Sequence, residues 1–140
     1  MFILDTNVIS EVMRDSPHQK VLAWIDDQFT SSLFVTAITE AEIRTGIALL
    51  PAGKRRRGLT AAAERTFEML FSERVLAFDS EAARAYAEIA SGRRVVGRPI
   101  SQADCQIAAI AKSQGASIVT RDVDDFEGCG VEVLNPWTDR

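Results

Sequence analysis

The sequence is poor in the residues on which several common kinds of protein depend. It has one histidine, His18, and two cysteines, Cys105 and Cys129, among 140 residues. Two thiols without ligand spacing and one histidine do not make a zinc site, and they do not make a disulfide framework. His18 follows Pro17 at an expected helix start, so a Ser-His-Asp mechanism has little support. The low cysteine content favours a reducing compartment, and we expect a cytoplasmic protein.

The chain also lacks long apolar runs, a glycine-rich phosphate loop and an excess of positive charge. No apolar run approaches the roughly 18 residues of a membrane span, so no membrane association is expected. An acid at position 5, with no basic segment before it, argues against a signal peptide. The formal charge of −4 argues against a general electrostatic binder of nucleic acid. The length and the 46% hydrophobic content suit one globular domain, residues 1–140.

Short, continuously apolar runs alternate along the chain with longer helical stretches. Continuous rather than alternating hydrophobicity is typical of strands that are covered on both faces. Strands that alternate with helices predict an α/β fold with a central parallel sheet, whose carboxyl edge carries the functional groups. The expected strands are 2–4, 33–35, 75–78, 117–120 and, more weakly, 131–134; the expected helices are 8–14, 18–28, 38–50, 58–71, 80–91 and 101–114.

Four carboxylates occupy positions where burial should disfavour them. Asp5 directly follows the first expected strand, and Asp122 follows the fourth. At about 100° per residue, Glu42 and Asp104 fall on the apolar sides of their helices. Asp104 is also the fourth residue of a capping-box-like segment that begins at Ser101, and an acid after a strand is often only a helix cap. Asp122 is the nearest to its strand of an acidic cluster that continues with residues 124 and 125.

Two other acids have simpler explanations. Glu40 lies four residues before Arg44 and is expected to form an exposed ion pair with it. Asp79 opens the helix expected at 80–91 and is expected to cap it.

Gly46 lies one turn after Glu42, where the absence of a side chain would make room for another backbone or a ligand.

Electrostatics favours a cation among the four acids. Two carboxylates about 4 Å apart repel each other by about 4 kcal/mol at an effective dielectric constant near 20. The total stability of a domain is only about 5–15 kcal/mol, so several converging acids need neutralisation. A divalent hard cation, which prefers oxygen ligands, would supply it.

The order and spacing of these segments resemble the PIN domain, and more closely the VapC-type toxins of type II toxin–antitoxin pairs, including the FitB-like subgroup. The similarity spans the whole chain. It implies a three-layer α/β/α fold with sheet order 3-2-1-4-5, dependence on Mg²⁺ or Mn²⁺, and cleavage of RNA. It also implies a homodimer, higher-order assembly with a VapB-like antitoxin, and DNA contact only through that antitoxin. The segments are Leu4-Asp5-Thr6-Asn7-Val8, Thr39-Glu40-Ala41-Glu42-Ile43, Ala103-Asp104, Thr120-Arg121-Asp122 and Asn135-Pro136-Trp137.

The resemblance places Asp5, Glu42, Asp104 and Asp122 at the acidic site, with Asn7 and Thr120 as polar companions. We hypothesise that Asp5 and Asp104 ligate a first Mg²⁺ directly. Glu42 would hold it through water or orient the attacking water, and Asp122 would complete the site or bind a second ion. In-line attack by metal-activated water should leave 5′-phosphate and 3′-hydroxyl ends.

Basic residues gather in two segments. Residues 54–57, Lys-Arg-Arg-Arg, are expected in a loop between two helices, either solvated or in contact with nucleic acid or a partner. Arg93, Arg94 and Arg98 are expected in a flexible loop before the helix of Asp104, where they would meet RNA phosphates.

Two further interpretations remain open from the sequence. The protein could act mainly in an antitoxin-bound complex on operator DNA, with little nuclease activity, because both roles would retain the four acids. A phospho-acceptor domain that uses Asp5 is less well supported, because the acidic pair expected before its acceptor strand is missing. The haloacid dehalogenase pattern fails because position 7 is Asn rather than Asp.

Overall fold

A five-stranded parallel sheet forms the centre of the computed structural model, which describes residues 1–138. The strands are β1 (Phe2–Leu4), β2 (Leu33–Thr36), β3 (Val75–Leu76), β4 (Ser117–Val119) and β5 (Val133–Leu134). They lie in the order β3-β2-β1-β4-β5, and every neighbouring pair is parallel. The expected sheet order is confirmed, and β1, which ends just before Asp5, is the central strand.

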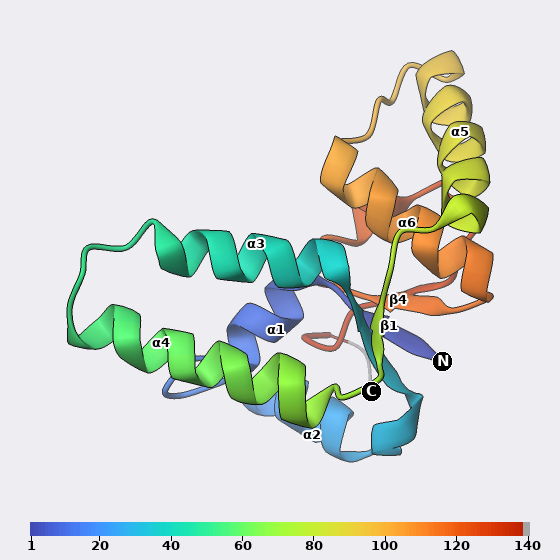
Figure 1. The fold of residues 1–140 in the computed structure, drawn as a ribbon. Helices are drawn as coiled ribbons and strands as arrows, with labels where there is room; N and C mark the ends of the chain where they lie inside the picture. The colour runs from blue at the N-terminus through green and yellow to red at the C-terminus, as the bar shows by residue number, and fades with distance from the viewer. Residues whose placement is uncertain (139–140) are drawn as a thin grey trace.

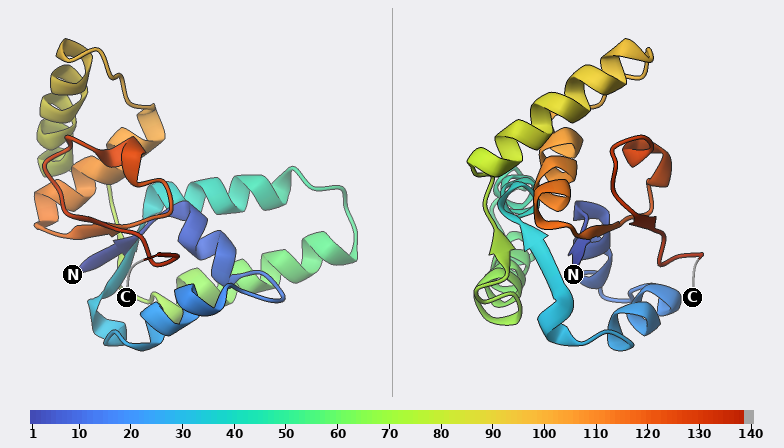
Figure 2. Two further views of the ribbon diagram at one scale, coloured as in Figure 1. Left: turned by 180° about the vertical axis from the view of Figure 1, so that it is seen from behind. Right: turned by 90° about the vertical axis from the view of Figure 1, so that its right-hand side faces the viewer.

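Helices cover both faces of this sheet and complete a three-layer α/β/α arrangement (Figures 1 and 2). No helix within residues 1–138 combines the length and the apolar character needed to cross a membrane. The helices are α1 (Thr6–Val12), α2 (Gln19–Asp26), α3 (Ala37–Ala48), α4 (Lys54–Glu64), α5 (Ser80–Val95) and α6 (Gln102–Gln114), with the short helical segments η1 (Thr30–Ser32), η2 (Arg65–Leu70) and η3 (Val123–Phe126).

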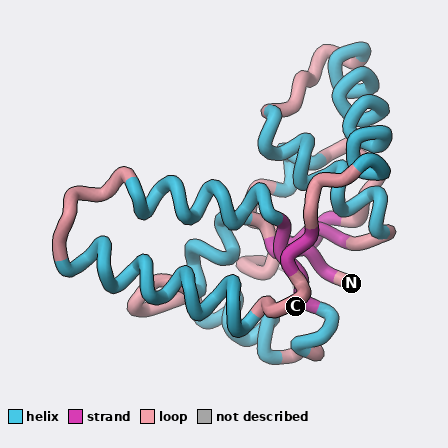
Figure 3. The backbone as a smooth tube through the Cα atoms, viewed as in Figure 1, coloured by secondary structure: helices cyan, strands magenta, loops and turns pink. Residues whose placement is uncertain are grey.

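Alternate residues of the strands belong to two separate cores. Ile3 of β1 and Ile118 of β4 pack into a cluster with α5 and α6. Leu4 and Val119, the next residue of each strand, pack into a second cluster with α1, α2 and η2. A strand alternates its side chains between the two faces, so a sheet covered on both faces needs apolar residues throughout. The short strands lie together at the centre of the molecule in Figure 3, between these helices.

The pair α3–α4 projects beyond the edge of the sheet (Figure 1). Arg44 joins the two helices: its Nε donates to Glu40 Oε2 at 2.8 Å, and a terminal nitrogen donates to Glu64 Oε1 at 2.8 Å. The predicted pair of Glu40 and Arg44 is confirmed, and it also ties α3 to α4. The loop expected at 54–57 is wrong, because these residues form the first turn of α4.

The loop expected around Arg93 and Arg94 is also wrong. Helix α5 continues to Val95, and Arg93 is a buried side chain within it. Its guanidinium donates to the main-chain oxygens of Arg98 at 2.7 Å, Asp125 at 3.0 Å and Glu127 at 2.8 Å. The sequence suggested a loop because glycine and arginine are typical of exposed segments. Here these carbonyl groups satisfy the buried charge and fix the end of the helix.

Candidate functional site

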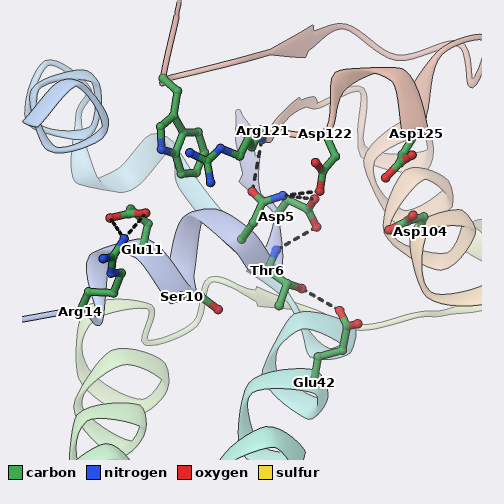
Figure 4. A pocket seen from close by; sticks show the side chains of 12 residues that line it. Asp5, Thr6, Ser10, Glu11, Arg14, Glu42, Asp104, Arg121, Asp122 and Asp125 are labelled. Carbon is green, nitrogen blue, oxygen red and sulfur yellow. Dashed lines mark hydrogen bonds and ion pairs between the residues drawn. The ribbon is translucent and has the colours of Figure 1, made fainter. Parts of the chain in front are cut away.

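All four predicted acids line one cavity of about 600 Å³. The cavity opens beside the carboxyl ends of β1, the central strand, and its neighbour β4. Each acid reaches it from a different element: Asp5 from the end of β1, Glu42 from α3, Asp104 from the first turn of α6, and Asp122 from the segment after β4 (Figure 4). The full lining is Asp5, Thr6, Asn7, Ser10, Glu11, Arg14, Glu42, Asp104, Arg121, Asp122, Asp125 and Trp137.

Asp5 is the buried centre of this group, with only 5% of its surface exposed. Its backbone has the extended conformation of a helix cap, and its Oδ1 accepts from the amide of Thr6 at 2.8 Å, so it caps α1. Its Oδ2 accepts from the Thr120 hydroxyl at 2.8 Å. These bonds hold the carboxylate in one orientation at the mouth of the sheet.

Asn7 and Thr120 connect Asp5 to Asp122. The side-chain nitrogen of Asn7, Nδ2, lies 3.1 Å from Asp122 Oδ2, 3.1 Å from Thr120 Oγ1 and 3.4 Å from Asp5 Oδ2. Thr120 Oγ1 also accepts from the amide of Asp122 at 3.0 Å. Asp122 precedes η3 but its side chain caps nothing there, so its carboxylate faces the cavity without a capping role. The two residues expected as polar companions therefore lie between two of the acids.

Glu42 reaches the cavity through Thr6, but not from a buried position. Its Oε1 accepts from the Thr6 hydroxyl at 2.7 Å, and that hydroxyl lies 3.0 Å from the Thr39 hydroxyl. The expectation that Glu42 lies on a buried apolar stripe is wrong, since the residue is exposed. The helical projection assumed that α3 packs along its whole length, whereas α3 projects from the sheet with α4. The expectation that Gly46 makes room for another backbone is wrong too. No atom lies within 4 Å of the position that a Cβ at Gly46 would occupy, so no other backbone approaches this residue.

Asp104 is half-buried at the start of α6. The Ser101 side chain accepts from the Asp104 amide at 3.2 Å and caps the helix, as the sequence suggested. The carboxylate of Asp104 lines the cavity. Capping by Ser101 and a place for Asp104 in the site are therefore compatible.

Burial and mutual repulsion both act on the acids. Burial raises the pKa of Asp5 from 3.8 to about 6, against the opposing hydrogen bonds from Thr120 and Thr6, and the nearby Asp104 and Glu42 raise it further. Burial also raises the pKa of Asp104, with Asp125, Glu42 and Asp122 adding to the effect. Two carboxyl groups with raised pKa values therefore line one cavity, and a cation placed there would favour their charged forms.

The donors fit a hard cation held with intervening water. They are carboxylate oxygens, which suit Mg²⁺ or Mn²⁺ rather than zinc. Within residues 1–138, no three Asp, Glu, His or Cys side chains are gathered closely enough to hold a metal ion by themselves. Mg²⁺ usually keeps several of its waters and takes only one or two carboxylates directly. The spread of the acids around the cavity is compatible with such a hydrated ion.

Several lining residues were not singled out from the sequence. Asp125 belongs to the acidic cluster after β4, whose inward-facing member the pattern does not identify. Thr6 follows Asp5, but its bond to Glu42 depends on the distant placement of α3. Ser10, Glu11 and Arg14 come from α1 and the residues after it, and their place in the site requires the three-dimensional fold.

The residues set aside as structural behave as expected. Asp79 caps α5 by accepting from the Ala82 amide at 3.0 Å. His18 caps α2 at an exposed position and accepts from the Lys20 amide at 3.2 Å. Cys105 and Cys129 are buried free thiols.

The basic residues proposed for RNA contact lie outside the cavity lining. The predicted contact of Arg93 with RNA is wrong, because its buried guanidinium already donates to three main-chain oxygens. Arg94 and Arg98 are exposed, and Arg98 lies 3.4 Å from Glu127. Contact of Arg94 and Arg98 with RNA stays a prediction.

Comparison with known proteins agrees with this architecture. The chain is 44% identical to the VapC ribonuclease Y4jK of Sinorhizobium fredii over 98% of each chain. It is 42% identical to the toxin FitB of Neisseria gonorrhoeae, over 99% of this chain and all of that protein. Among solved structures, FitAB bound to a DNA fragment contains a chain that matches with a TM-score of 0.93 at 41% identity, over 100% of this chain and 98% of that one.

The family model of the PIN domain matches residues 2–128, which include the four acids, Asn7 and Thr120. The matched segment contains strands β1 to β4 and all of the helices. The chain therefore belongs to the PIN domain family.

Proposed function

We propose that this protein is a Mg²⁺-dependent endoribonuclease, with Mn²⁺ as an alternative ion, and the toxin of a VapBC-type toxin–antitoxin pair. The observation that carries the proposal is the convergence of Asp5, Glu42, Asp104 and Asp122 on one cavity at the carboxyl edge of the sheet. Relatives named as a ribonuclease and as a toxin, similar over nearly the whole chain, support the same activity.

The chain's own groups would divide the work as follows. Asp5 and Asp104, the acids with raised pKa values, would hold the cation directly, since a cation favours the charged forms that burial and the neighbouring acids disfavour. Glu42 would hold a bound water, because its exposed carboxylate is anchored by the Thr6 hydroxyl at 2.7 Å. Asp122, oriented by Asn7, would complete the site. The cation would supply a lowered pKa for the attacking water and positive charge beside the scissile phosphate.

We also propose that an antitoxin controls this activity, with the toxin as a homodimer that forms a larger assembly with it. The structural relative FitAB was solved as a complex on DNA, and one of its chains matches this one over 98% of that chain's length. By this account the chain contacts DNA only through its antitoxin, and the complex is cytoplasmic.

The test is cleavage of structured RNA by the purified, antitoxin-free protein with Mg²⁺. Asp5→Ala should lower the rate by at least about a hundredfold, because it removes the central charge-bearing oxygen ligand. Asp104→Asn should have a similar effect. Asp79→Asn is the matched control, since Asp79 also caps a helix but lies outside the cavity.

Circular dichroism of each variant would separate loss of chemistry from loss of the fold. Equal rates for the wild type and a folded Asp5→Ala variant would refute the assignment of the site. A rate that fell as much in Asp79→Asn as in Asp5→Ala would do so too.

A second candidate function has one observation in its favour. The FitAB relative was solved on a DNA fragment, so a role chiefly in a DNA-binding complex with an antitoxin is compatible with the fold. If this role dominates, the purified protein should cleave RNA no faster than its Asp5→Ala variant. Its complex with the antitoxin should still bind operator DNA.

A further inference from the structure

The cavity has two chemically different walls. Asp104, Asp122 and Asp125 lie at one side of Figure 4, and Arg14 lies at the opposite side with Ser10. Trp137 from the end of the chain also lines the cavity, as does Arg121 from the segment after β4. One wall therefore offers only acceptors, while Arg14 and Arg121 bring hydrogen-bond donors to the same space.

Arg121 is not paired with the acids around it. It directly precedes Asp122, yet the ion pairs within residues 1–138 involve other basic side chains. Its guanidinium carbon instead lies 4.7 Å from the ring centroid of Trp137. A guanidinium that stacks on an aromatic face keeps the N–H donors at its edge, in a fork that matches the oxygens of a phosphate.

Trp137 is a buried support for this guanidinium. Its side chain is buried, with 8% of the residue exposed, and its Nε1 has no hydrogen-bond partner among residues 1–138. Because this nitrogen is itself buried, Trp137 serves the guanidinium of Arg121 as a fixed stacking surface rather than as a donor to a ligand.

Arg14 lines the cavity on the side of Ser10. Its side chain is 67% exposed, and it lies 3.3 Å from the buried carboxylate of Glu11. Glu11 also accepts from the amide of His18 at 3.0 Å, so it holds the chain after α1 in place. The charge of Arg14 is partly neutralised by Glu11, whereas Arg121 has no ion pair among residues 1–138. Arg121 is therefore the more available cation for a ligand.

The charges on the two sides of the cavity indicate which class of ligand would bind beside Arg121. If the scissile phosphate of RNA sits beside the acids, the strand must leave the cavity along one of the walls. The acidic wall repels the next phosphate, whereas the wall of Arg121 and Trp137 attracts it. Single-stranded RNA also offers bases that stack on arginine planes and aromatic rings, which a peptide carboxylate does not.

We propose that Arg121, stacked on Trp137, binds the phosphate of the RNA strand next to the one that is cleaved. This proposal rests on the proposed function, because it takes RNA as the substrate. It assigns Arg121 to substrate binding rather than to the chemical step, and it makes Trp137 the support that orients the guanidinium.

Trp137 fluorescence gives a direct measurement of binding. The chain has two tryptophans, and Trp24→Phe leaves Trp137 as the only one. Asp5→Asn in the same chain, with EDTA, prevents cleavage during the titration. A short single-stranded RNA should then change the Trp137 fluorescence as it binds, and Arg121→Gln should weaken binding at least tenfold. The slope of log K against log salt should become shallower by about 0.7 if one phosphate contact is lost.

Two further variants sharpen the result. Arg121→Lys should keep most of the salt dependence but bind more weakly than arginine, because lysine lacks the planar fork. Arg84→Gln is the matched control; Arg84 pairs with Glu81 on the surface of α5 and lies outside the cavity, so its loss should leave affinity unchanged. In the cleaving protein, Arg121→Gln should raise KM while kcat changes little.

The possible outcomes separate this proposal from the proposed function. If the RNA binds equally well to the Arg121→Gln variant, with the same salt slope, the phosphate subsite is wrong and the nuclease stands. If the parent protein binds no RNA, the proposed function fails, and this proposal fails with it. If Arg121→Gln weakens only the binding of an antitoxin peptide, the wall serves a protein partner and the proposal is overturned.

Discussion

Replacing Asp5 by Asn should stabilise the metal-free protein at neutral pH. Asp5 is 5% exposed, and its pKa is raised from 3.8 to about 6, chiefly by burial and also by Asp104 and Glu42. This rise corresponds to roughly 3 kcal/mol of free energy between the charged and neutral forms. Asn keeps the shape and can still cap α1 by accepting from the Thr6 amide, because Asn and Asp are comparable caps.

The sign of the pH dependence follows from the raised pKa. The folded protein binds a proton at Asp5 more tightly than the unfolded chain does. The favourable contribution of that proton is complete below about pH 4 and is lost as the pH rises through 6. The wild type and Asp5→Asn should therefore have equal free energies of unfolding near pH 4. By pH 7 the variant should be more stable, by up to about 3 kcal/mol.

Urea unfolding in EDTA at pH 4, 5, 6 and 7, at one protein concentration, measures this difference. Mg²⁺ added at about 1,000 times its dissociation constant should then reverse the order, because binding at that concentration stabilises the folded state by about 4.1 kcal/mol. Only the wild type should respond. Asp79→Asn serves as the control and should gain no stability at pH 7. A variant Asp5→Asn that is less stable than the wild type at pH 7 in EDTA would refute the electrostatic reasoning.

Three other predictions concern groups around the site. Thr6→Val removes the hydroxyl that donates to Glu42 at 2.7 Å, and it should lower activity or Mg²⁺ affinity by roughly 10–100-fold with little change in stability; unchanged kinetics would contradict a positioning role. Arg93→Lys should cost about 2 kcal/mol in urea unfolding, because lysine cannot reach all three main-chain oxygens, whereas Arg94→Lys should be neutral. Burial raises the pKa of the Cys105 thiol to about 11. A thiol reagent at pH 8 should therefore modify Cys105 only at the rate of unfolding. Fast labelling of the native protein would show that the reagent reaches Cys105 without unfolding.

The central part of the fold follows from local pattern. The run 2–4 is apolar at each position because β1 is covered on both faces, so both its strand character and its central place could be predicted. The resemblance to the PIN domain supplied the sheet order, which spacing alone does not contain. Asp79 and Ser101 could be recognised as caps because capping depends on only a few neighbouring residues.

The errors arise where distant contacts decide the structure. Arg93 is buried because carbonyl groups more than thirty positions away accept from it, and no local pattern reports such partners. Glu42 was expected to be buried because a helical projection assumes uniform packing along α3. Its place in the site depends instead on Thr6, which meets it across the gap between α1 and α3. Arg121 and Trp137 become neighbours only when the end of the chain returns to β4.

The most direct test of the central claim is the cleavage of RNA by the purified, antitoxin-free protein, with analysis of the product ends. The account predicts cleavage that requires Mg²⁺, stops with EDTA, resumes when Mg²⁺ is restored, and leaves 5′-phosphate and 3′-hydroxyl ends. Cleavage that continues in EDTA, or that leaves a 2′,3′-cyclic phosphate, would contradict the claim that these acids hold a cation which activates water.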